Sequence, residues 1–303
     1  MPRGYHCIKA GLLALGVCVL ACGAAPAAPA TNAAPLRIVT SFYPLYITTL
    51  NIVAGVPGVS LKNLTRPTTG CLHDYQLTPA ELRALADADV FIVNGAGLES
   101  FLTKVMAHTT NLTVVTASQG LDLLRDEHGV NPHVWVSISG AIGQARAIAA
   151  ALAARDPRNA LAYQRNCAAY VAQLAALRAE MQAGLSSATT RTIITFHEAF
   201  PYFAREFDLR IAAVIEREPG SEPNPRELAA TIQLVRKTGV TALCTEPQYS
   251  ARAAAAIARE CGATVYLLDP AATGPQTNAA YLMIMRQNLA TLQRALNAAP
   301  QNQ

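Results

Sequence analysis

Three histidines and one aspartate stand where metal-binding chemistry is plausible: His73, His133, His197 and Asp269. His73 lies in TGCLHDYQLTP and His133 in NPHVW, while His197 and Asp269 directly follow the strand-like runs RTIITF and ATVYLL. Three imidazoles and a carboxylate suit Zn²⁺, whereas Ca²⁺ and Mg²⁺ prefer oxygen ligands. The four residues are too far apart in sequence to form a compact motif such as H-E-x-x-H. The alternative is that each histidine satisfies a local turn or a polar group in the core.

A cysteine adds a second question, because Cys71 stands two residues before His73. A thiolate there could compete for a metal ion, but we expect a buried or disulfide-bonded cysteine. Cys244 ends a strand-like run and Cys261 ends the next helix, so these two could form a disulfide in an oxidising compartment. Spacing alone does not determine pairing. The alternative is that all four, with Cys167, are small buried hydrophobic residues.

The elements that position these residues alternate between strand and helix at both ends of the chain, which predicts an α/β fold with parallel strands. In the first part, apolar runs predict strands at 36–41, 58–64, 89–94 and 111–116, with helices at 44–54, 79–88 and 98–106. Thr78-Pro79-Ala80-Glu81 is a capping box that opens the second of these helices. In the last part, strands are predicted at 191–196, 210–215, 240–246 and 263–269, with helices at 198–207, 225–239, 251–261 and 278–296.

The middle of the chain differs, since residues 139–185 consist almost entirely of helix-forming residues. Asp156-Pro157 is the one interruption and predicts a new helix start, so two helices are expected, the second one long. IVTSFYPLY and IITFHEAFPYF also resemble each other: an apolar strand, a turn containing Phe, and a helix entry with an aromatic residue and Pro. We therefore predict two similar α/β lobes linked by a long rigid helix. A cleft between them would receive the residues at the strand ends.

The N-terminus has the pattern of an export signal. Arg3 and Lys9 precede a short apolar run, and Ala28-Pro29-Ala30 offers a cleavage site. Export and release are favoured, and lipid attachment at Cys22 is the alternative. The predicted divisions are a signal peptide at 1–30, an N-terminal lobe at 31–138, linking helices at 139–186 and a C-terminal lobe at 187–303.

Composition narrows the class of partner. The 303 residues are 51% hydrophobic and 15% charged, with a net charge of +4. No basic stripe with interleaved aromatic residues appears, which argues against nucleic acid as a partner.

Several motifs together resemble a known family, the periplasmic solute-binding proteins of zinc and manganese ABC importers (cluster A-I, ZnuA/TroA-like). The resemblance covers essentially the whole mature chain. In order, the motifs are HDYQLTPAELRALADADVFIVNGAGLESFL, NPHVW, TFHEAFPYFAREFDL, EREPGSEPNPRELAATI, TEPQYS and LDP. The resemblance implies one metal ion bound between two lobes that a rigid long helix connects.

The resemblance also implies a ligand for each matching position. His73 matches the first ligand, His133 the second, and His197 the third, which is Glu in manganese-preferring relatives. Asp269 matches the Asp that completes the set in many members, while others use water or a neighbouring Glu. Zinc-specific members often carry a long loop rich in His and acidic residues before the second ligand. Only RDEHGVNPH stands there, so an auxiliary metal-collecting role is not expected.

The resulting hypothesis is a non-enzymatic, monomeric carrier that works in the periplasm or elsewhere outside the cytoplasm. It binds Zn²⁺, with Mn²⁺ possible, and delivers it to the permease of an ABC importer in the inner membrane. A manganese-preferring carrier is the first alternative. A zinc hydrolase is less favoured, because a fourth protein ligand would close the coordination sphere and no positioned base stands out. Cell adhesion is a further alternative, since relatives of this family have been called adhesins.

Overall fold

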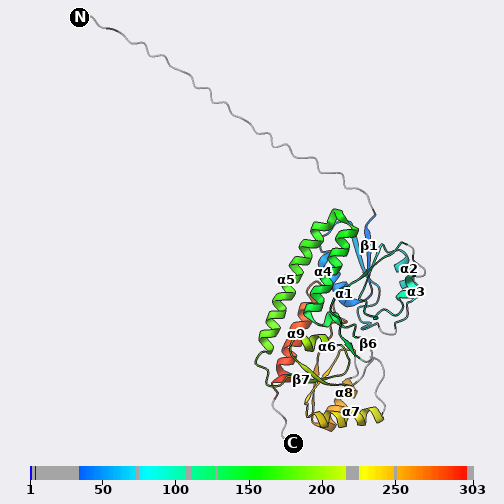
Figure 1. Cartoon of the computed structure of the whole chain (residues 1–303), viewed down its shortest axis with the longest axis vertical. Coiled ribbons are helices and arrows are strands. Elements are labelled where there is room, and N and C mark those ends of the chain that lie inside the picture. The colour runs from blue at the N-terminus through cyan, green and yellow to red at the C-terminus, as the bar shows by residue number, and fades with distance from the viewer. Residues whose placement is uncertain are drawn as a thin grey trace. The chain divides into compact units, whose positions relative to one another are not determined.

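Two four-stranded parallel sheets organise the chain, as the computed structural model in Figure 1 shows. The structure describes residues 34–72, 75–106, 109, 111–126, 129–215, 225–248 and 251–298, together with residues 1 and 4. The strand orders are β2-β1-β3-β4 and β10-β9-β7-β8. Numbered within each lobe, both orders read 2-1-3-4, so the two lobes share one topology. In both sheets the chain reverses its direction of winding between the first and third strands, where α/β folds bind ligands.

The first lobe alternates strands and helices as predicted. Its strands are β1 (Leu36–Thr40), β2 (Val59–Asn63), β3 (Val90–Val93) and β4 (Thr113–Thr116), and its helices are α1 (Tyr43–Ile52), α2 (Pro79–Ala86) and α3 (Leu102–Met106). All four residues of β3, VFIV, are buried, as expected for a central parallel strand covered on both faces. The capping box is present, because Thr78 and Glu81 each accept a backbone hydrogen bond from the other.

One helix in this lobe is shorter than predicted. The run 98–106 becomes α3 only from Leu102, because Gly95, Ala96 and Gly97 all have positive φ and turn the chain sharply after β3. Gly95 is required there, since an added Cβ would lie 2.4 Å from the Thr116 side chain. A small hairpin that the sequence did not predict, β5 (Arg125–Asp126) with β6 (Gly129–Val130), precedes the turn that carries His133.

The second lobe repeats the arrangement, and its elements follow the prediction except that the helix predicted at 198–207 is shorter and begins only at Pro201. The strands are β7 (Thr192–Thr195), β8 (Arg210–Val214), β9 (Ala242–Thr245) and β10 (Thr264–Leu267), and the helices are α6 (Pro201–Glu206), α7 (Pro225–Thr238), α8 (Ala251–Cys261) and α9 (Ala280–Leu296). All described pairings within this sheet are parallel.

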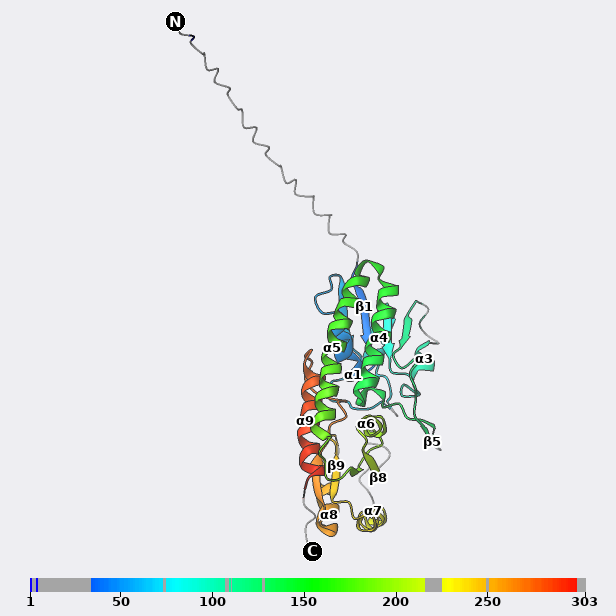
Figure 2. The ribbon, with the colours of Figure 1, turned by 60° about the vertical axis from the view of Figure 1, so that its left-hand side comes forward.

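Two helices link the lobes. They are α4 (Ile138–Arg155) and α5 (Ala160–Leu185), separated at Asp156 by the short helix η2 (Pro157–Asn159). In α5 a buried residue recurs every three or four positions, from Tyr163 to Leu185, which forms one apolar stripe. This stripe packs against α1, α4 and α9, and Figures 1 and 2 show α5 running from one sheet to the other. The predicted fold of two similar lobes linked by a long helix is therefore confirmed.

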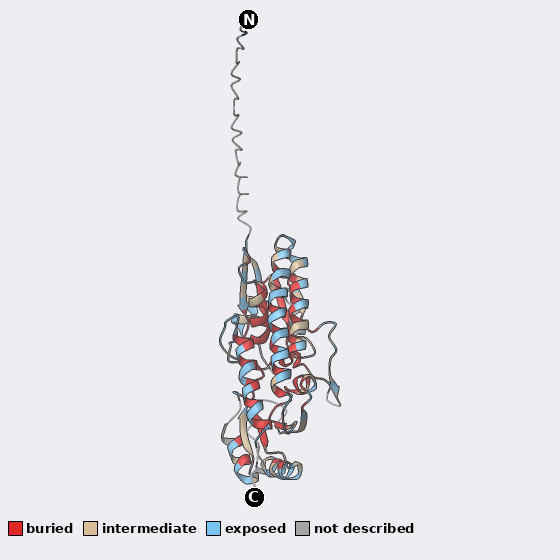
Figure 3. Ribbon diagram, turned by 90° about the vertical axis from the view of Figure 1, so that its left-hand side faces the viewer, coloured by how far each residue is buried: buried red, intermediate tan, exposed pale blue. Residues whose placement is uncertain are grey.

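The hydrophobic core is continuous through the linking helices. One large cluster runs from the first sheet through α4 and α5 to α9 and reaches the second lobe at Phe200 and Phe203. A smaller cluster fills the space between β7, β9, α7 and α8. Figure 3 shows the buried faces of the long helices turned towards the rest of the lobes. The linking helices are thus part of the main core rather than a spacer between two cores.

The predicted signal peptide and Cys22 lie outside the described residues, apart from Met1 and Gly4. Among the residues that are described, no helix combines the length and apolar character needed to cross a membrane.

Candidate metal centre

Two of the predicted histidines meet at the junction of the lobes. His197 lies two residues beyond β7 and is 0% exposed. His133 is 2% exposed and stands at the start of the short helix η1 (Val134–Val136), which leads into α4. The two rings lie edge to face with their centroids 4.7 Å apart. The prediction that segments far apart in sequence come together here is confirmed for these two side chains.

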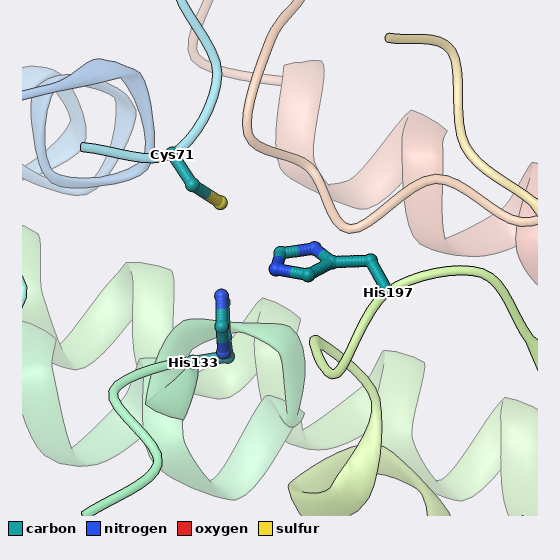
Figure 4. A group of neighbouring side chains, drawn as sticks. All are labelled: Cys71, His133 and His197. Atoms are coloured by element: carbon teal, nitrogen blue, oxygen red, sulfur yellow. The ribbon is translucent and has the colours of Figure 1, made fainter. Parts of the chain in front are cut away.

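A cysteine completes the group. Ligand atoms of Cys71, His133 and His197 all lie within 4.8 Å of one another, and Figure 4 shows the three side chains pointing towards a common space. The sequence led us to expect Cys71 to be buried or in a disulfide, and this is wrong. Cys71 is only half-buried, and its thiol faces the histidines. The available signal was its position two residues before His73, which placed it in the same loop.

The chemistry of this group fits a metal ion. Atoms that share a tetrahedral zinc ion lie about 3.3–3.8 Å apart, given metal–ligand bonds of about 2.0–2.3 Å. An arrangement already within 4.8 Å needs only a small closure to reach that geometry. Nitrogen and sulfur ligands suit Zn²⁺ and other borderline or soft ions better than Ca²⁺ or Mg²⁺.

His133 is oriented by a neighbour in its own turn. Asn131 Oδ1 accepts from the backbone N–H of His133 at 2.9 Å and lies 3.1 Å from its Nδ1. The Asn131 amide also donates to the carbonyl of Glu198 at 2.9 Å, and Tyr202 donates to the carbonyl of Asn131 at 2.8 Å. Because Glu198 directly follows His197, Asn131 ties the two histidine segments to each other.

An aromatic wall backs the same turn. The Trp135 ring lies 5.2 Å from His133 and 4.8 Å from Phe42, measured between centroids. Trp135 Nε1 donates to the carbonyl of Pro270 at 2.9 Å, and Tyr281 donates to the carbonyl of Trp135 at 2.8 Å. The wall keeps water from one side of the site and holds the Asp269–Pro270 turn beside it.

His197 contacts a buried carboxylate that our reading of the sequence did not single out. Both oxygens of Glu246 lie 3.4 Å from His197 Nδ1, and Glu246 is 1% exposed. Gln248 Nε2 donates to Glu246 Oε2 at 3.0 Å. Burial raises the pKa of Glu246, while the hydrogen bond and charge of His197 act in the opposite direction. The segment TEPQYS carried a family resemblance, but nothing in its pattern pointed to His197.

Of the other two predicted ligands, His73 and Asp269, only Asp269 lies in the described part of the chain. His73 lies outside the described residues. Asp269 follows β10 and accepts from Ala271 N at 2.8 Å through Oδ1, while Asn288 bonds both its backbone N–H and its carbonyl. Burial raises the pKa of Asp269 to about 6, and the charge of Glu246 adds to this. Among described residues, Asp269 does not join the group within 4.8 Å, so its role as a ligand stays a prediction.

The disulfide considered from sequence does not form. Cys244 and Cys261 both carry thiols, and Cys244 is 0% exposed at the centre of β9. Cys167 is a buried thiol on α5. These three cysteines fit the alternative of small residues that pack in or against the core.

The chain is similar in sequence to known metal-binding proteins. A high-affinity zinc uptake system protein, ZnuA, from Bacillus subtilis is 28% identical over 94% of this chain and 97% of its own length. The zinc-binding lipoprotein AdcA of Streptococcus pneumoniae is 28% identical over 86% of this chain, which spans 55% of AdcA.

The chain is also similar to proteins of known structure. The solute-binding protein FpvC of Pseudomonas aeruginosa, in complex with Mn²⁺, is 32% identical with a TM-score of 0.78, over 86% of this chain and 98% of FpvC. A crystal structure of ZnuA is 31% identical with a TM-score of 0.75, over 87% and 100% of the two chains. The laminin-binding adhesin Lmb of Streptococcus agalactiae is 27% identical with a TM-score of 0.77, over 86% and 99%.

The family model described as zinc-uptake complex component A, periplasmic, matches residues 38–295, which is most of the chain. The chain therefore belongs to the ZnuA family of non-enzymatic, extracytoplasmic metal-binding proteins that serve ABC uptake systems.

Proposed function

We propose that the metal carried by this protein is Zn²⁺, which it captures between the lobes and delivers to the permease of an ABC importer in the membrane. The observation that supports this most directly is the group of Cys71, His133 and His197 at the lobe junction. Two imidazoles and a thiol form a nitrogen and sulfur set, which favours zinc over the harder Mn²⁺. The uptake protein from Bacillus subtilis and AdcA are both described by their zinc function.

A manganese-preferring carrier is the alternative, and it has a specific observation behind it. Structures of FpvC, at 32% identity, are described with Mn²⁺ and with Ni²⁺. Adhesion is a weaker second function, supported only by similarity to Lmb.

We further propose that His73 and Asp269 complete the coordination sphere around zinc. His73 matches the first ligand of the family, and the Asp269 turn is fixed beside the site by the bond from Trp135 to Pro270. Cys71 would then share the sphere with these residues or take the place of Asp269.

Direct competition between the two metals tests the proposal. The metal-free protein is titrated with Zn²⁺ and with Mn²⁺ against a chelator of known affinity. We expect zinc to bind more tightly. His133→Ala and His197→Ala should each weaken zinc binding by more than about 100-fold, since each removes a ligand and leaves water in its place. Equal or reversed affinities would remove the zinc assignment, while unchanged affinity in both variants would move the site elsewhere.

Cobalt substitution tests the sulfur ligand. Co²⁺ bound to a thiolate absorbs strongly in the near ultraviolet, so we expect such a band in the parent and its loss in Cys71→Ser. Cys261→Ser is the matched control, because Cys261 is also a half-buried thiol but lies on α8, away from the histidines. A band that survives Cys71→Ser would exclude a thiolate ligand at this position.

The place of action follows from the N-terminal pattern. We propose that residues 1–30 are removed on export and that the mature carrier is a soluble monomer, with lipid attachment at Cys22 as the alternative. The mass of the protein recovered from cells distinguishes the two, because a lipid-anchored chain would begin at Cys22 and carry the added acyl groups.

A further inference from the structure

The two lobes repeat a polar contact as well as a topology. In the first lobe, Ser41 directly follows the first strand, β1, and its hydroxyl donates to Glu99 at 2.8 Å. Glu99 lies beyond the third strand, β3. In the second lobe, His197 follows the first strand, β7, and contacts Glu246, which directly follows the third strand, β9. Both lobes thus bring a side chain beyond the first strand into contact with a buried glutamate beyond the third strand, although the strand register aligns Glu246 with Asn94 rather than with Glu99.

The surroundings of Glu246 suggest what its carboxylate does. It is 1% exposed, and both its oxygens lie 3.4 Å from His197 Nδ1. Gln248 holds Oε2 from the other direction at 3.0 Å. Glu246 is absent from the group of described side chains whose ligand atoms lie within 4.8 Å of one another, so the carboxylate stands behind the histidine rather than beside the metal position.

We infer that Glu246 is the positioning residue of His197. Its carboxylate accepts a hydrogen bond from Nδ1–H, which leaves Nε2 as the nitrogen that binds the metal. Gln248 in turn holds Glu246 in place. This inference rests on the proposed metal-carrier function and names a residue through which that function is tuned.

The chemistry of imidazole supports this division of roles. A neutral ring has one N–H donor and one acceptor nitrogen, and a metal can use only the acceptor. A carboxylate behind Nδ1 selects the tautomer, prevents the ring from turning and makes the ligand nitrogen more basic. A contact of 3.4 Å is longer than the usual 2.7–3.2 Å. A metal on Nε2 makes Nδ1–H a stronger donor, so we expect this contact to shorten on binding.

His133 shows how the two rings differ. Its Nδ1 faces Asn131 Oδ1 at 3.1 Å. The neutral amide of Asn131 therefore orients the His133 ring, as the carboxylate of Glu246 orients the His197 ring. Both rings are thereby held at Nδ1, and the acceptor seen among the described residues is a neutral amide for His133 and a carboxylate for His197. The electrostatic contribution to metal affinity should therefore come mainly from the side of His197.

The test uses Glu246→Gln in the full mature protein, with Glu99→Gln as the matched control. Glutamine keeps the size of the side chain but removes its charge. Zinc affinity is measured by chelator competition, and the tautomer of each histidine is read from ¹⁵N–¹H correlation spectra of metal-free protein labelled with ¹⁵N-histidine.

We expect Glu246→Gln to weaken zinc binding about 10–100-fold, the range found when groups that orient metal ligands are removed. In the metal-free protein, His197 should lose its preference for the Nδ1–H tautomer. Glu246→Asp should restore part of both properties. Glu99→Gln should change neither by more than about threefold, because Glu99 contacts no histidine among the residues described.

Two results would overturn the inference: an unchanged zinc affinity in Glu246→Gln together with an unchanged His197 tautomer, or an equal effect of Glu99→Gln. If Glu246→Gln does not fold, Gln248→Ala provides the second variant, with a smaller loss of affinity and the same loss of tautomer preference expected. Failure of the carrier function itself looks different, since the parent would then bind no zinc while the tautomer spectra still report on Glu246.

Discussion

Glu99 and Glu246 are both buried glutamates that lie beyond the third strand of their lobe, but they have different partners. Glu99 is 6% exposed and accepts from the backbone N–H groups of Asn94 and Gly95, at 2.7 and 3.0 Å, and from the Ser41 hydroxyl. Glu246 is 1% exposed, and among the described residues it contacts the side chains of His197 and Gln248. Burial raises the pKa of both carboxyl groups, and the hydrogen bonds act against it.

The difference shows that the two lobes use a buried glutamate beyond the third strand for two purposes. A carboxylate held by backbone N–H groups stabilises a turn, because those donors cannot move away without breaking the turn. A carboxylate held by side chains can orient one of them for a ligand. The first lobe thus uses its glutamate to fix the Asn94–Gly97 turn, and the second is arranged to hold His197.

A third glutamate, Glu206, resembles Glu99 because it also accepts hydrogen bonds from backbone N–H groups. Glu206 ends α6 in the second lobe and accepts from the first two backbone N–H groups of α4, those of Ile138 and Ser139, at 2.7 and 3.1 Å. Arg178 on α5 pairs with the same carboxylate at 2.7 Å. The side chain is 5% exposed, so Glu206 clamps the second lobe to both linking helices.

The largest effect is expected from Glu99→Ala. Removing the carboxylate leaves up to three buried donors without an acceptor, and each costs about 1–3 kcal/mol, so the free energy of unfolding should fall by about 3 kcal/mol. Urea unfolding followed by circular dichroism measures this. Zinc affinity of the folded fraction should stay within about threefold of the parent. A variant of parental stability that binds zinc poorly would reverse the roles of the two glutamates.

Glu206→Gln should have the next largest effect. The change removes the charge that faces the N-terminus of α4 and the ion pair with Arg178, for a loss of about 2 kcal/mol in unfolding free energy. The same urea titration gives the value. Glu180→Gln is the control, since Glu180 pairs with Arg286 but is 44% exposed and should contribute little. Equal losses in both variants would show that Glu206 does not clamp the lobes.

Asn131→Ala sharpens the comparison of the two histidines. Loss of the amide frees His133 at Nδ1 and breaks the bond to Glu198, so zinc affinity should fall about tenfold, at the lower end of the range for orienting groups. Chelator competition on Asn131→Ala and Glu246→Gln side by side ranks the two. If Asn131→Ala lost more zinc affinity than Glu246→Gln, the carboxylate of Glu246 would not be the more important of the two acceptors.

The smallest effect concerns a carboxylate at the opposite, N-terminal edge of the first sheet. Arg37 donates to Asp89 through its backbone N–H and its guanidinium, and this bonding lowers the pKa of Asp89. Because the folded pKa lies below the unfolded value of ~3.9, the stabilisation is present above about pH 4 and is lost as the pH falls through the folded pKa. The pair is partly exposed, at 50% and 28%, so it stabilises the fold only weakly.

Asp89→Asn should therefore reduce the unfolding free energy by about 0.5 kcal/mol at pH 7. The difference from the parent should shrink towards pH 3. Urea midpoints at the two pH values provide the measurement. A difference that grows on acidification would mean that the pKa of Asp89 is raised rather than lowered by folding.

Much of this architecture could be predicted from local sequence. Apolar runs of the right length predicted all eight sheet strands, and Asp156-Pro157 predicted the break between α4 and α5. These predictions succeeded because strand and helix formation depend on periodicity and on residues at element ends, which are local properties. The shortened start of α3 was missed, because the turn of three residues with positive φ after β3 includes Gly95, whose close packing against Thr116 appears only in the tertiary structure.

The metal site, like the fold, could be predicted only in part from the sequence. The residue types of His133 and His197, the turn of His133 before the long helices and the strand-end position of His197 could be read from the sequence, since ligand-binding residues of parallel sheets gather at the carboxyl ends of the strands. Neither the thiol of Cys71 at the histidines nor the carboxylate of Glu246 behind His197 could be read there. Both depend on how loops from β2, β7 and β9 meet across two lobes, and that is set by the shared core of α4 and α5.

The sequence by itself determined the repeated α/β pattern, the long helices and the donor types available to a metal, because each follows from neighbours along the chain. Only the tertiary structure decided which donors face one another and which acceptor stands behind each ring. The physical reason is distance: His197 and Glu246 are 49 residues apart along the chain yet lie in contact, and only the pairing of β7 with β9 brings them there.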